Sequence, residues 1–124
     1  MNYVVADTQQ WEQAAAYLID THPRVRAFVK NAGLGFGIPY LHNGQVHEYV
    51  PDFLIQFVDL PGVTLILETK GYDQLAEIKQ SAAQRWVDAV NAENKLKPER
   101  NRGGWLYAMV RKISEIPEIL AGVT

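Results

Sequence analysis

The sequence predicts a single α/β domain in which a mixed β-sheet is flanked by helices. Apolar residues recur at helical spacing near the N-terminus, follow strand-like patterns through the middle, and return to helical spacing after residue 73. One more apolar segment follows, so the expected order is α-β-β-β-α-β. A strand that is reached through a crossover helix should lie parallel to its neighbour in the sheet. The length of 124 residues fits one domain, without an internal linker.

The N-terminal third is predicted to be helical. Asp7 to Gln10 is typical of a helix start, and apolar residues follow at helical spacing. Pro23 ends or kinks this helix. Because Pro also suits the first turn of a helix, a second helix is expected from Pro23 to Gly33. The residues that define the first apolar face are Trp11, Ala15, Leu18 and Ile19.

The middle of the chain is predicted to form strands. Asn43-Gly44 is a strong hairpin signal, and Asp59 to Gly62 marks a second turn. Apolar segments lie on both sides of each turn. These signals predict an antiparallel meander with strands at residues 38–42, 45–49, 53–58 and 63–70.

A second long helix and a final strand complete the expected fold. From Asp73, a plausible N-cap, the apolar period of 3.6 continues to about Asn94. A polar segment follows, and then the apolar segment from Trp105 to Val110. We expect this last strand to pair in parallel with residues 63–70.

Composition excludes several functional classes. The chain has no Cys, which rules out disulfide frameworks, Cys-based zinc sites and a Cys nucleophile. Its formal net charge is −2, so any contact with nucleic acid must be local. The longest apolar runs are far shorter than the roughly 20 residues that span a bilayer, and no signal pattern opens the chain. We expect a cytoplasmic domain with no membrane partner.

Asp52, Glu68 and Lys70 are charged residues in unusual positions. Asp52 follows Pro51 at the start of one apolar strand, whereas Glu68 and Lys70 end another and share one of its faces. The turn predicts that residue numbers summing to about 121 oppose one another. This register sets Asp52 across from Thr69 or, with a one-residue bulge, from Glu68. Asp52 and Glu68 could therefore share one ion.

Two carboxylates at such a distance repel, so the site either takes up a proton or attracts a cation. Hard oxygen ligands suit Mg²⁺ or Mn²⁺, and two carboxylates leave coordination positions for water and a phosphate oxygen. Lys70 could then hold or help to deprotonate the attacking water, or balance charge in the transition state. The alternative is that Glu68 and Lys70 form only a surface ion pair at a strand end.

Three segments carry a resemblance to a known family. They read VKNAGLGFGIPYLHNGQVHEYVPDFLIQFVDLPGVTLILETKGYD, AAQRWVDAVN and GGWLYAMV. In this order they resemble the C-terminal endonuclease domain of type III restriction enzymes, within the PD-(D/E)XK nuclease superfamily. The resemblance covers roughly residues 11–110. It implies a restriction-endonuclease-like core and a metal-dependent deoxyribonuclease.

The resemblance also implies roles for individual residues. Asp52 and Glu68 match the metal-binding acids of the family, and Lys70 matches its catalytic lysine. Together these three residues correspond to the family's catalytic residues. Thr69 matches the position whose backbone carbonyl often completes the metal shell. The implied cofactor is Mg²⁺, for which Mn²⁺ can substitute.

The resemblance further implies partners. The substrate would be double-stranded DNA, and in the family the domain works with a helicase-like motor domain and a methyltransferase subunit. This sequence contains neither, so we expect residues 1–124 to be one endonuclease domain from a longer helicase-nuclease chain, with ATP acting only through the separate motor. Two alternatives stay open: a repair or recombination nuclease acting on DNA ends or junctions, and a catalytically inactive DNA-binding or interaction domain of the same fold.

Other charged residues have open interpretations. A basic segment could contact the DNA backbone or form a solvated loop; its residues are Lys95, Lys97, Arg100 and Arg102. Some superfamily members add an acid from the first helix, for which Glu12 and Asp20 are the candidates, but both are interpreted as solvated helix charges. Glu77 and Lys79 are interpreted as surface residues.

Overall fold

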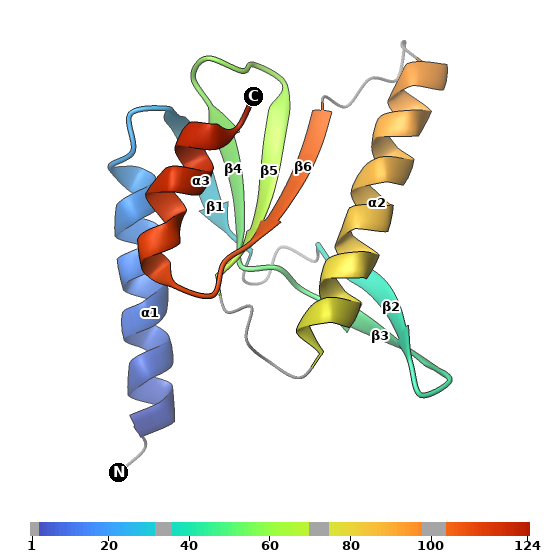
Figure 1. Ribbon diagram of the computed structural model, residues 1–124, viewed down its shortest axis with the longest axis horizontal. Coiled ribbons are helices and arrows are strands. Elements are labelled where there is room, and N and C mark those ends of the chain that lie inside the picture. Colours follow the sequence, from blue (N-terminus) through green and yellow to red (C-terminus); the bar gives the residue numbers. More distant parts are fainter. Residues whose placement is uncertain (1–2, 32–35, 70–74, 98–103) are drawn as a thin grey trace.

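The computed structural model describes residues 3–31, 36–69, 75–97 and 104–124. Within these ranges the protein has a mixed α/β fold, in which a mixed sheet is flanked by helices as predicted (Figure 1). The elements in chain order are α1 (Tyr3–Asp20), β1 (Val25–Lys30), β2 (Ile38–His42), β3 (Gln45–Tyr49), β4 (Phe53–Phe57), β5 (Val63–Glu68), α2 (Ala76–Leu96), β6 (Gly104–Met109), the 3₁₀ turn η2 (Ile113–Glu115) and α3 (Ile116–Gly122).

The main sheet has four strands in the order β1-β4-β5-β6. β1 pairs with β4 and β4 with β5 in antiparallel fashion, whereas β6 is parallel to β5. The parallel pairing confirms the prediction for the last strand, which reaches the sheet through α2. β2 and β3 form a separate two-stranded sheet.

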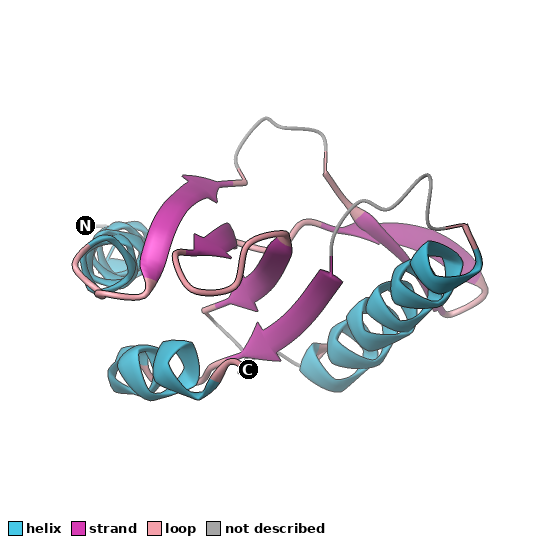
Figure 2. Ribbon diagram, turned by 90° about the horizontal axis from the view of Figure 1, so that it is seen from above, coloured by secondary structure: helices cyan, strands magenta, loops and turns pink. Residues whose placement is uncertain are grey.

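The two faces of the main sheet pack against different helices (Figure 2). Because side chains alternate along a strand, Phe53 and Ile55 of β4 and Leu65 and Leu67 of β5 share one face, where α1 and α3 cover them. Ile66 of β5 points to the opposite face. There it packs with α2 and the β2–β3 hairpin in a second apolar cluster.

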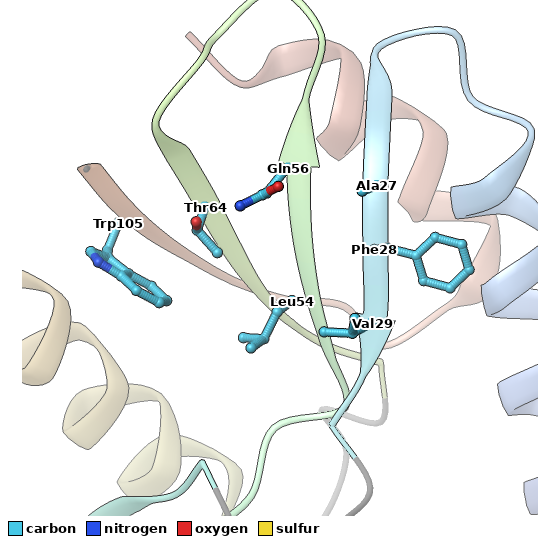
Figure 3. A pocket seen from close by; sticks show the side chains of 7 residues that line it. All are labelled: Ala27, Phe28, Val29, Leu54, Gln56, Thr64 and Trp105. Atoms are coloured by element: carbon cyan, nitrogen blue, oxygen red, sulfur yellow. The ribbon is translucent and has the colours of Figure 1, made fainter. Parts of the chain in front are cut away.

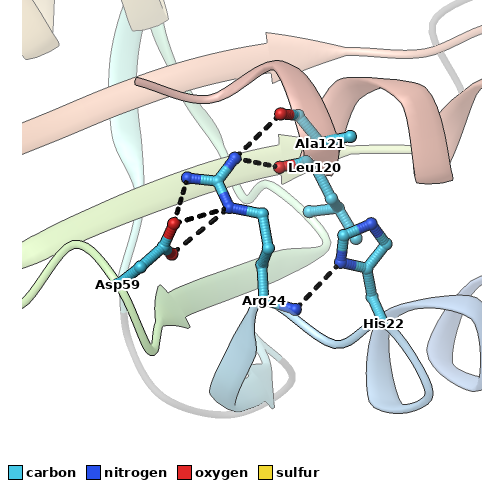
Figure 4. Close-up of polar contacts among 5 residues, drawn as sticks. All are labelled: His22, Arg24, Asp59, Leu120 and Ala121. Atoms are coloured by element: carbon cyan, nitrogen blue, oxygen red, sulfur yellow. Dashed lines mark hydrogen bonds and ion pairs between the residues drawn. The ribbon is translucent and has the colours of Figure 1, made fainter.

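Arg24, just before β1, joins three parts of the fold (Figure 4). Its guanidinium pairs with Asp59 in the β4–β5 turn, at 3.0 Å for the Nη2–Oδ2 pair. Its Nη1 donates to the carbonyl oxygens of Leu120 and Ala121, each at 2.9 Å. Arg24 therefore satisfies carbonyl groups that the end of α3 leaves without a helical partner.

The predicted second helix is wrong, because residues Val25–Lys30 form strand β1. Phe28 lies opposite Ile55 and Lys30 opposite Phe53 in the pairing with β4. Six residues are too few for apolar spacing to separate a helix from a strand. The hydrogen bonds to β4 decide the outcome, and β4 begins more than twenty residues later in the chain.

The predicted meander is also only partly correct. The hairpin around Asn43-Gly44 forms as predicted, and both residues have positive φ angles of 53° and 74°. Its strand β3 does not continue into pairing with β4, however, because Pro51 interrupts the chain between them. Pro lacks the N–H that a continued strand ladder needs. The hairpin is therefore free to pack against α2 instead.

The helix boundaries differ from the predicted ones. α1 begins at Tyr3, ahead of the expected start near Asp7, and α2 runs past Asn94 to Leu96. The predicted N-cap Asp73 lies outside the described residues. The C-terminal helix α3 was not predicted, although its Ile116 and Leu120 are fully buried against the first core.

Candidate functional site

The β4–β5 pairing brings Asp52 and Glu68 to the same end of the sheet. Phe53 lies opposite Leu67, and continuing this register places Asp52 opposite Glu68 without a bulge. Of the two partners that the sequence left open for Asp52, Thr69 or, with a one-residue bulge, Glu68, the structure has Glu68, and the bulge is not needed. The reason is the loop between the strands, which contains an odd number of residues and so shifts the pairing relative to a four-residue turn.

Both carboxyl groups accept a hydrogen bond from one backbone amide. The N–H of Thr69 donates to Asp52 Oδ2 at 3.0 Å and to Glu68 Oε1 at 3.2 Å. The Thr69 hydroxyl donates to the same Asp52 oxygen at 2.7 Å. Thr69 is fully buried and Glu68 is only 9% exposed. We call Asp52 and Glu68 the acid pair.

Asn31, at the end of β1, holds the backbone that carries Asp52. The Asn31 N–H donates to the carbonyl of Asp52 at 2.8 Å. Its side-chain amide donates to the carbonyls of Pro51 and Phe36, both at 3.0 Å. Asn31 is buried, so these bonds form away from competing water and tie the start of β4 to β1.

Trp11 supports the acid pair from the opposite face of the sheet. Its indole N–H donates to the carbonyl of Thr69 at 2.7 Å. Thr69 is thus bonded to the acid pair through its N–H and hydroxyl and to α1 through its carbonyl. The site residue at the end of β5 is held from both sides of the sheet.

The acid pair has perturbed electrostatics. Burial, reinforced by the hydrogen bond and the negative charge of Asp52, raises the pKa of Glu68 to about 8. The Tyr49 hydroxyl and the positive charge of Lys79 act in the opposite direction on this pKa. At neutral pH and without a cation, Glu68 therefore holds a proton. Such uptake is one of the two ways in which close carboxyl groups reduce their repulsion.

Lys79 and Tyr49 act on Glu68, and Tyr107 contacts Tyr49, but all three were missed or misjudged from the sequence. Lys79, expected at the surface, is half-buried, and its ammonium lies 5.6 Å from the centroid of the Tyr49 ring. Tyr49 is 2% exposed, and its hydroxyl lies 3.0 Å from that of Tyr107. They come from α2, β3 and β6, so no local motif could have linked them.

The structure does not bring all the predicted site residues together. Lys95 and Lys97 are exposed at the C-terminal end of α2, whereas Lys79 lies near its start. The rise of 1.5 Å per residue separates Lys95 from Lys79 by about 24 Å along the helix. The predicted residues Lys70, Arg100 and Arg102 lie outside the described residues.

The two acidic residues of α1 that were considered as additional site residues, Glu12 and Asp20, have different surroundings. Glu12 forms an ion pair with Lys30 of β1, with its carboxylate oxygen 2.6 Å from the ammonium nitrogen. Asp20 is exposed at the end of α1, which agrees with its interpretation as a solvated charge. Within the described ranges, no three or more His, Cys, Asp or Glu side chains gather as a metal-binding group.

A pocket of about 360 Å³ opens on the α2 side of the sheet (Figure 3). Its walls contain none of the predicted site residues; they are Ala27, Phe28, Val29, Leu54, Gln56, Thr64 and Trp105. In Figure 3 the Phe28 ring points away from Thr64 and Trp105. The pocket and the acid pair are therefore separate features.

No protein-family model matches the chain, and no curated protein or solved structure matches it. In the described part of the chain, none of the helices combines the length and the apolar character needed to cross a membrane. Fold and site together define a mixed α/β domain that carries a buried Glu68 beside a half-buried Asp52 at one end of its sheet.

Proposed function

We propose that this chain is a Mg²⁺-dependent endonuclease domain that hydrolyses DNA phosphodiester bonds. Its place would be that of the C-terminal domain in the restriction subunit of a type III restriction-modification system, in the PD-(D/E)XK superfamily. One observation carries the proposal: Asp52 and Glu68 converge on the amide of Thr69. The antiparallel pair β4–β5, followed by α2 and the parallel strand β6, agrees with the order of elements that the resemblance implies.

The donor atoms at this site suit a hard divalent cation. The carboxylates of Asp52 and Glu68 and the carbonyl of Thr69 would hold Mg²⁺, with the remaining positions left to water and a phosphate oxygen. The Thr69 carbonyl already accepts the indole N–H of Trp11, but a carbonyl oxygen has two lone pairs. When bound, the ion would activate a water molecule and neutralise charge on the phosphate.

The protein's own residues prepare this chemistry. The amide and hydroxyl of Thr69 orient Asp52, and the same amide orients Glu68. Glu68 must release its proton before it can act as a ligand, and Lys79 favours this release through its positive charge. Lys70, two residues after Glu68, is the proposed lysine of the reaction and would stabilise charge on the attacking water or the phosphate.

The charge of the chain bears on its partners. A net charge of −2 gives no general attraction for DNA, so we propose that target selection comes from a motor domain and a methyltransferase subunit. ATP would be used only by that motor. Lys95 and Lys97 are exposed and remain proposed contacts for the DNA backbone, about 24 Å along α2 from Lys79.

Calorimetric titration with Mn²⁺ tests the ion site directly. Wild type should bind Mn²⁺, whereas Asp52→Asn and Glu68→Gln should each weaken binding severely, because each removes one anionic ligand. Glu118→Gln is the matched control, since Glu118 is exposed on α3 and its loss removes the same charge elsewhere. Equal affinities in all four proteins would refute the proposal.

A cleavage assay separates the proposed function from its alternatives. With Mg²⁺ or Mn²⁺, wild type should cut covalently closed plasmid, and Asp52→Asn should not. Faster cutting of linear ends or branched junctions than of closed duplex would instead favour a repair-type nuclease. Mn²⁺ binding without any cleavage, including in a reconstituted assembly with motor and methyltransferase, would favour the non-catalytic domain.

A further inference from the structure

The pocket of about 360 Å³ lies on the same face of the main sheet as the acid pair, although the two share no residue. Along β4, Asp52, Leu54 and Gln56 alternate onto one face, and Leu54 belongs to the apolar cluster on the α2 side. Along β5, Thr64 and Glu68 point to this same face, because Thr64 lies opposite Gln56. At about 3.4 Å per residue, Leu54 lies about 7 Å and Gln56 about 14 Å from Asp52 along the strand. The pocket therefore begins beside the acid pair.

The edge strand β1 leaves this face of the sheet open to solvent. Ala27 lies opposite Gln56 and Val29 opposite Leu54, so both point to the pocket side. The Ala27 side chain ends at its Cβ atom, and Val29 is 47% exposed. A larger side chain at position 27 would project into the pocket. The sheet therefore presents an accessible apolar surface next to the acid pair.

Trp105 forms an aromatic wall of the pocket. In Figure 3 its ring extends from β6 toward Leu54. The ring contacts Trp86 edge-on, with centroids 5.1 Å apart at 88°, and it lies parallel to the Phe36 ring at 6.1 Å. The Asn91 side chain accepts from the backbone N–H of Trp105 at 3.0 Å and donates to its carbonyl at 2.9 Å. These neighbours hold the wall in place before a ligand binds, which lowers the entropy cost of binding.

Two polar side chains enter the pocket (Figure 3). Gln56 and Thr64 lie opposite each other in the β4–β5 pairing, so their side chains are neighbours. An amide offers both donors and an acceptor, and a hydroxyl can donate and accept. None of the seven described residues that line the pocket is charged. The pocket therefore suits a neutral ring with polar atoms along its edge, and not a phosphate.

We propose that this pocket binds one unpaired nucleobase of the DNA strand whose phosphate lies at the acid pair. The inference rests on the proposed function, which supplies the nucleic acid. Pockets that take a base out of its stack combine apolar or aromatic walls with hydrogen bonds to the base edge, and this pocket has both. Its volume falls within the range of small-ligand sites. Gln56 and Thr64 would contact the edge of the base.

Binding of short single-stranded oligodeoxynucleotides, followed by fluorescence anisotropy in the presence of Mn²⁺, tests this pocket. One oligonucleotide carries all its bases, and the other has the same sugar-phosphate backbone without its central bases. Both contain linkages that resist hydrolysis. Because the two carry the same charge, contacts with the backbone contribute equally to both affinities. Wild type should bind the complete oligonucleotide about 10-fold more tightly, which is the usual effect of one base against an aromatic side chain.

Two variants locate this difference in the pocket. Ala27→Leu narrows the pocket and should remove most of the difference between the two oligonucleotides. Gln56→Leu removes the contact with the base edge and should weaken binding of the complete oligonucleotide only. The matched controls are Ala89→Leu on α2 and Gln45→Leu on β3, both at exposed positions, and they should keep the wild-type difference. Thermal unfolding of each variant checks that it is folded at the temperature of the binding assay.

Three results would overturn the base pocket. The first is equal affinity of wild type for the two oligonucleotides, or no binding of either. The second is a difference that persists in both Ala27→Leu and Gln56→Leu, because the base would then bind elsewhere. The third is a wild-type dimer that Ala27→Leu dissociates in sedimentation experiments, which would assign the pocket to a second copy of the chain.

The outcomes also distinguish this inference from the proposed function. If wild type binds Mn²⁺ and cuts plasmid but does not discriminate between the two oligonucleotides, the proposed function stands and the base pocket does not. If wild type discriminates between them but neither binds Mn²⁺ nor cuts plasmid, the proposed function is refuted. The pocket would then be the base-binding site of a non-catalytic domain.

Discussion

The indole N–H of Trp11 donates to the carbonyl oxygen of Thr69 at 2.7 Å, although the two residues are 58 positions apart. Trp11 belongs to α1, which covers the face of the sheet opposite to α2. Thr69 directly follows β5 and contacts both members of the acid pair. A helix on one face of the sheet therefore supports a polar site that is completed by residues on the other.

Replacing Trp11 with Phe should lower the free energy of unfolding by about 1–3 kcal/mol beyond the loss of ring volume, because it leaves a buried carbonyl unpaired. Trp105→Phe is the control for ring volume, since the Trp105 indole N–H has no hydrogen-bond partner within the described residues. Urea denaturation of both variants measures the difference. Equal losses would mean that the bond to Thr69 contributes nothing to stability.

The raised pKa of Glu68 predicts how stability changes with pH. The folded protein holds the Glu68 proton up to about pH 8, whereas the unfolded chain releases it near the ordinary value of 4.5. The folded state thus binds more protons in this interval. The free energy of unfolding should therefore fall as pH rises from about 4.5 to 8, by up to about 1.4 kcal/mol per unit.

Glu68→Gln should remove this part of the pH dependence and make the protein more stable than wild type at pH 8. Denaturation in urea at pH 5.5, 7 and 8.5, without divalent cations, measures the slope. Glu118→Gln should retain the wild-type slope, because Glu118 is exposed. A slope that is the same in Glu68→Gln and wild type would rule out Glu68 as its source.

Asn31→Ala should reduce both stability and Mn²⁺ affinity. The substitution removes the side-chain bonds to the carbonyls of Pro51 and Phe36, at a cost of about 1–3 kcal/mol in unfolding free energy, and it releases the backbone that carries Asp52. Asn91 offers a matched control. Its side chain bonds to the N–H and carbonyl of Trp105, away from the acid pair.

Asn91→Ala should therefore lower stability by a similar amount while leaving Mn²⁺ affinity unchanged. Calorimetric titration and urea denaturation of the two variants measure both quantities. If Asn91→Ala weakens Mn²⁺ binding as much as Asn31→Ala does, the effect comes from general destabilisation and not from the position of Asp52.

Arg24→Lys should destabilise the fold by about 1 kcal/mol without affecting the ion site. A lysine cannot reproduce the paired bonds to Asp59 together with the bonds to the carbonyls of Leu120 and Ala121. Thermal unfolding should show a decrease of several degrees for a domain of this size. Arg26→Lys, at an exposed position of β1, should unfold near the wild-type temperature.

Local patterns were sufficient for some elements of the fold. Asn43-Gly44 specifies a hairpin because both residues tolerate positive φ, and the 3.6-residue period of α2 extends over many turns. The parallel pairing of β6 follows from the handedness and length of its crossover connection. The prediction for residues Val25–Lys30 failed because the structure of so short a segment depends on its tertiary neighbours. Here the edge of β4 provides hydrogen-bond partners for a strand.

The sequence by itself determined the α/β class, the hairpin, the long helix α2, and the proximity of Asp52 to Glu68, because these depend on residue period, turn residues and strand spacing. Only the tertiary structure decided the β4–β5 register and the surroundings of the acid pair. Trp11, Tyr49 and Lys79 reach it from three elements that are distant in the chain. Their convergence depends on how helices and sheets pack, and this packing cannot be predicted from the spacing of residues within one segment.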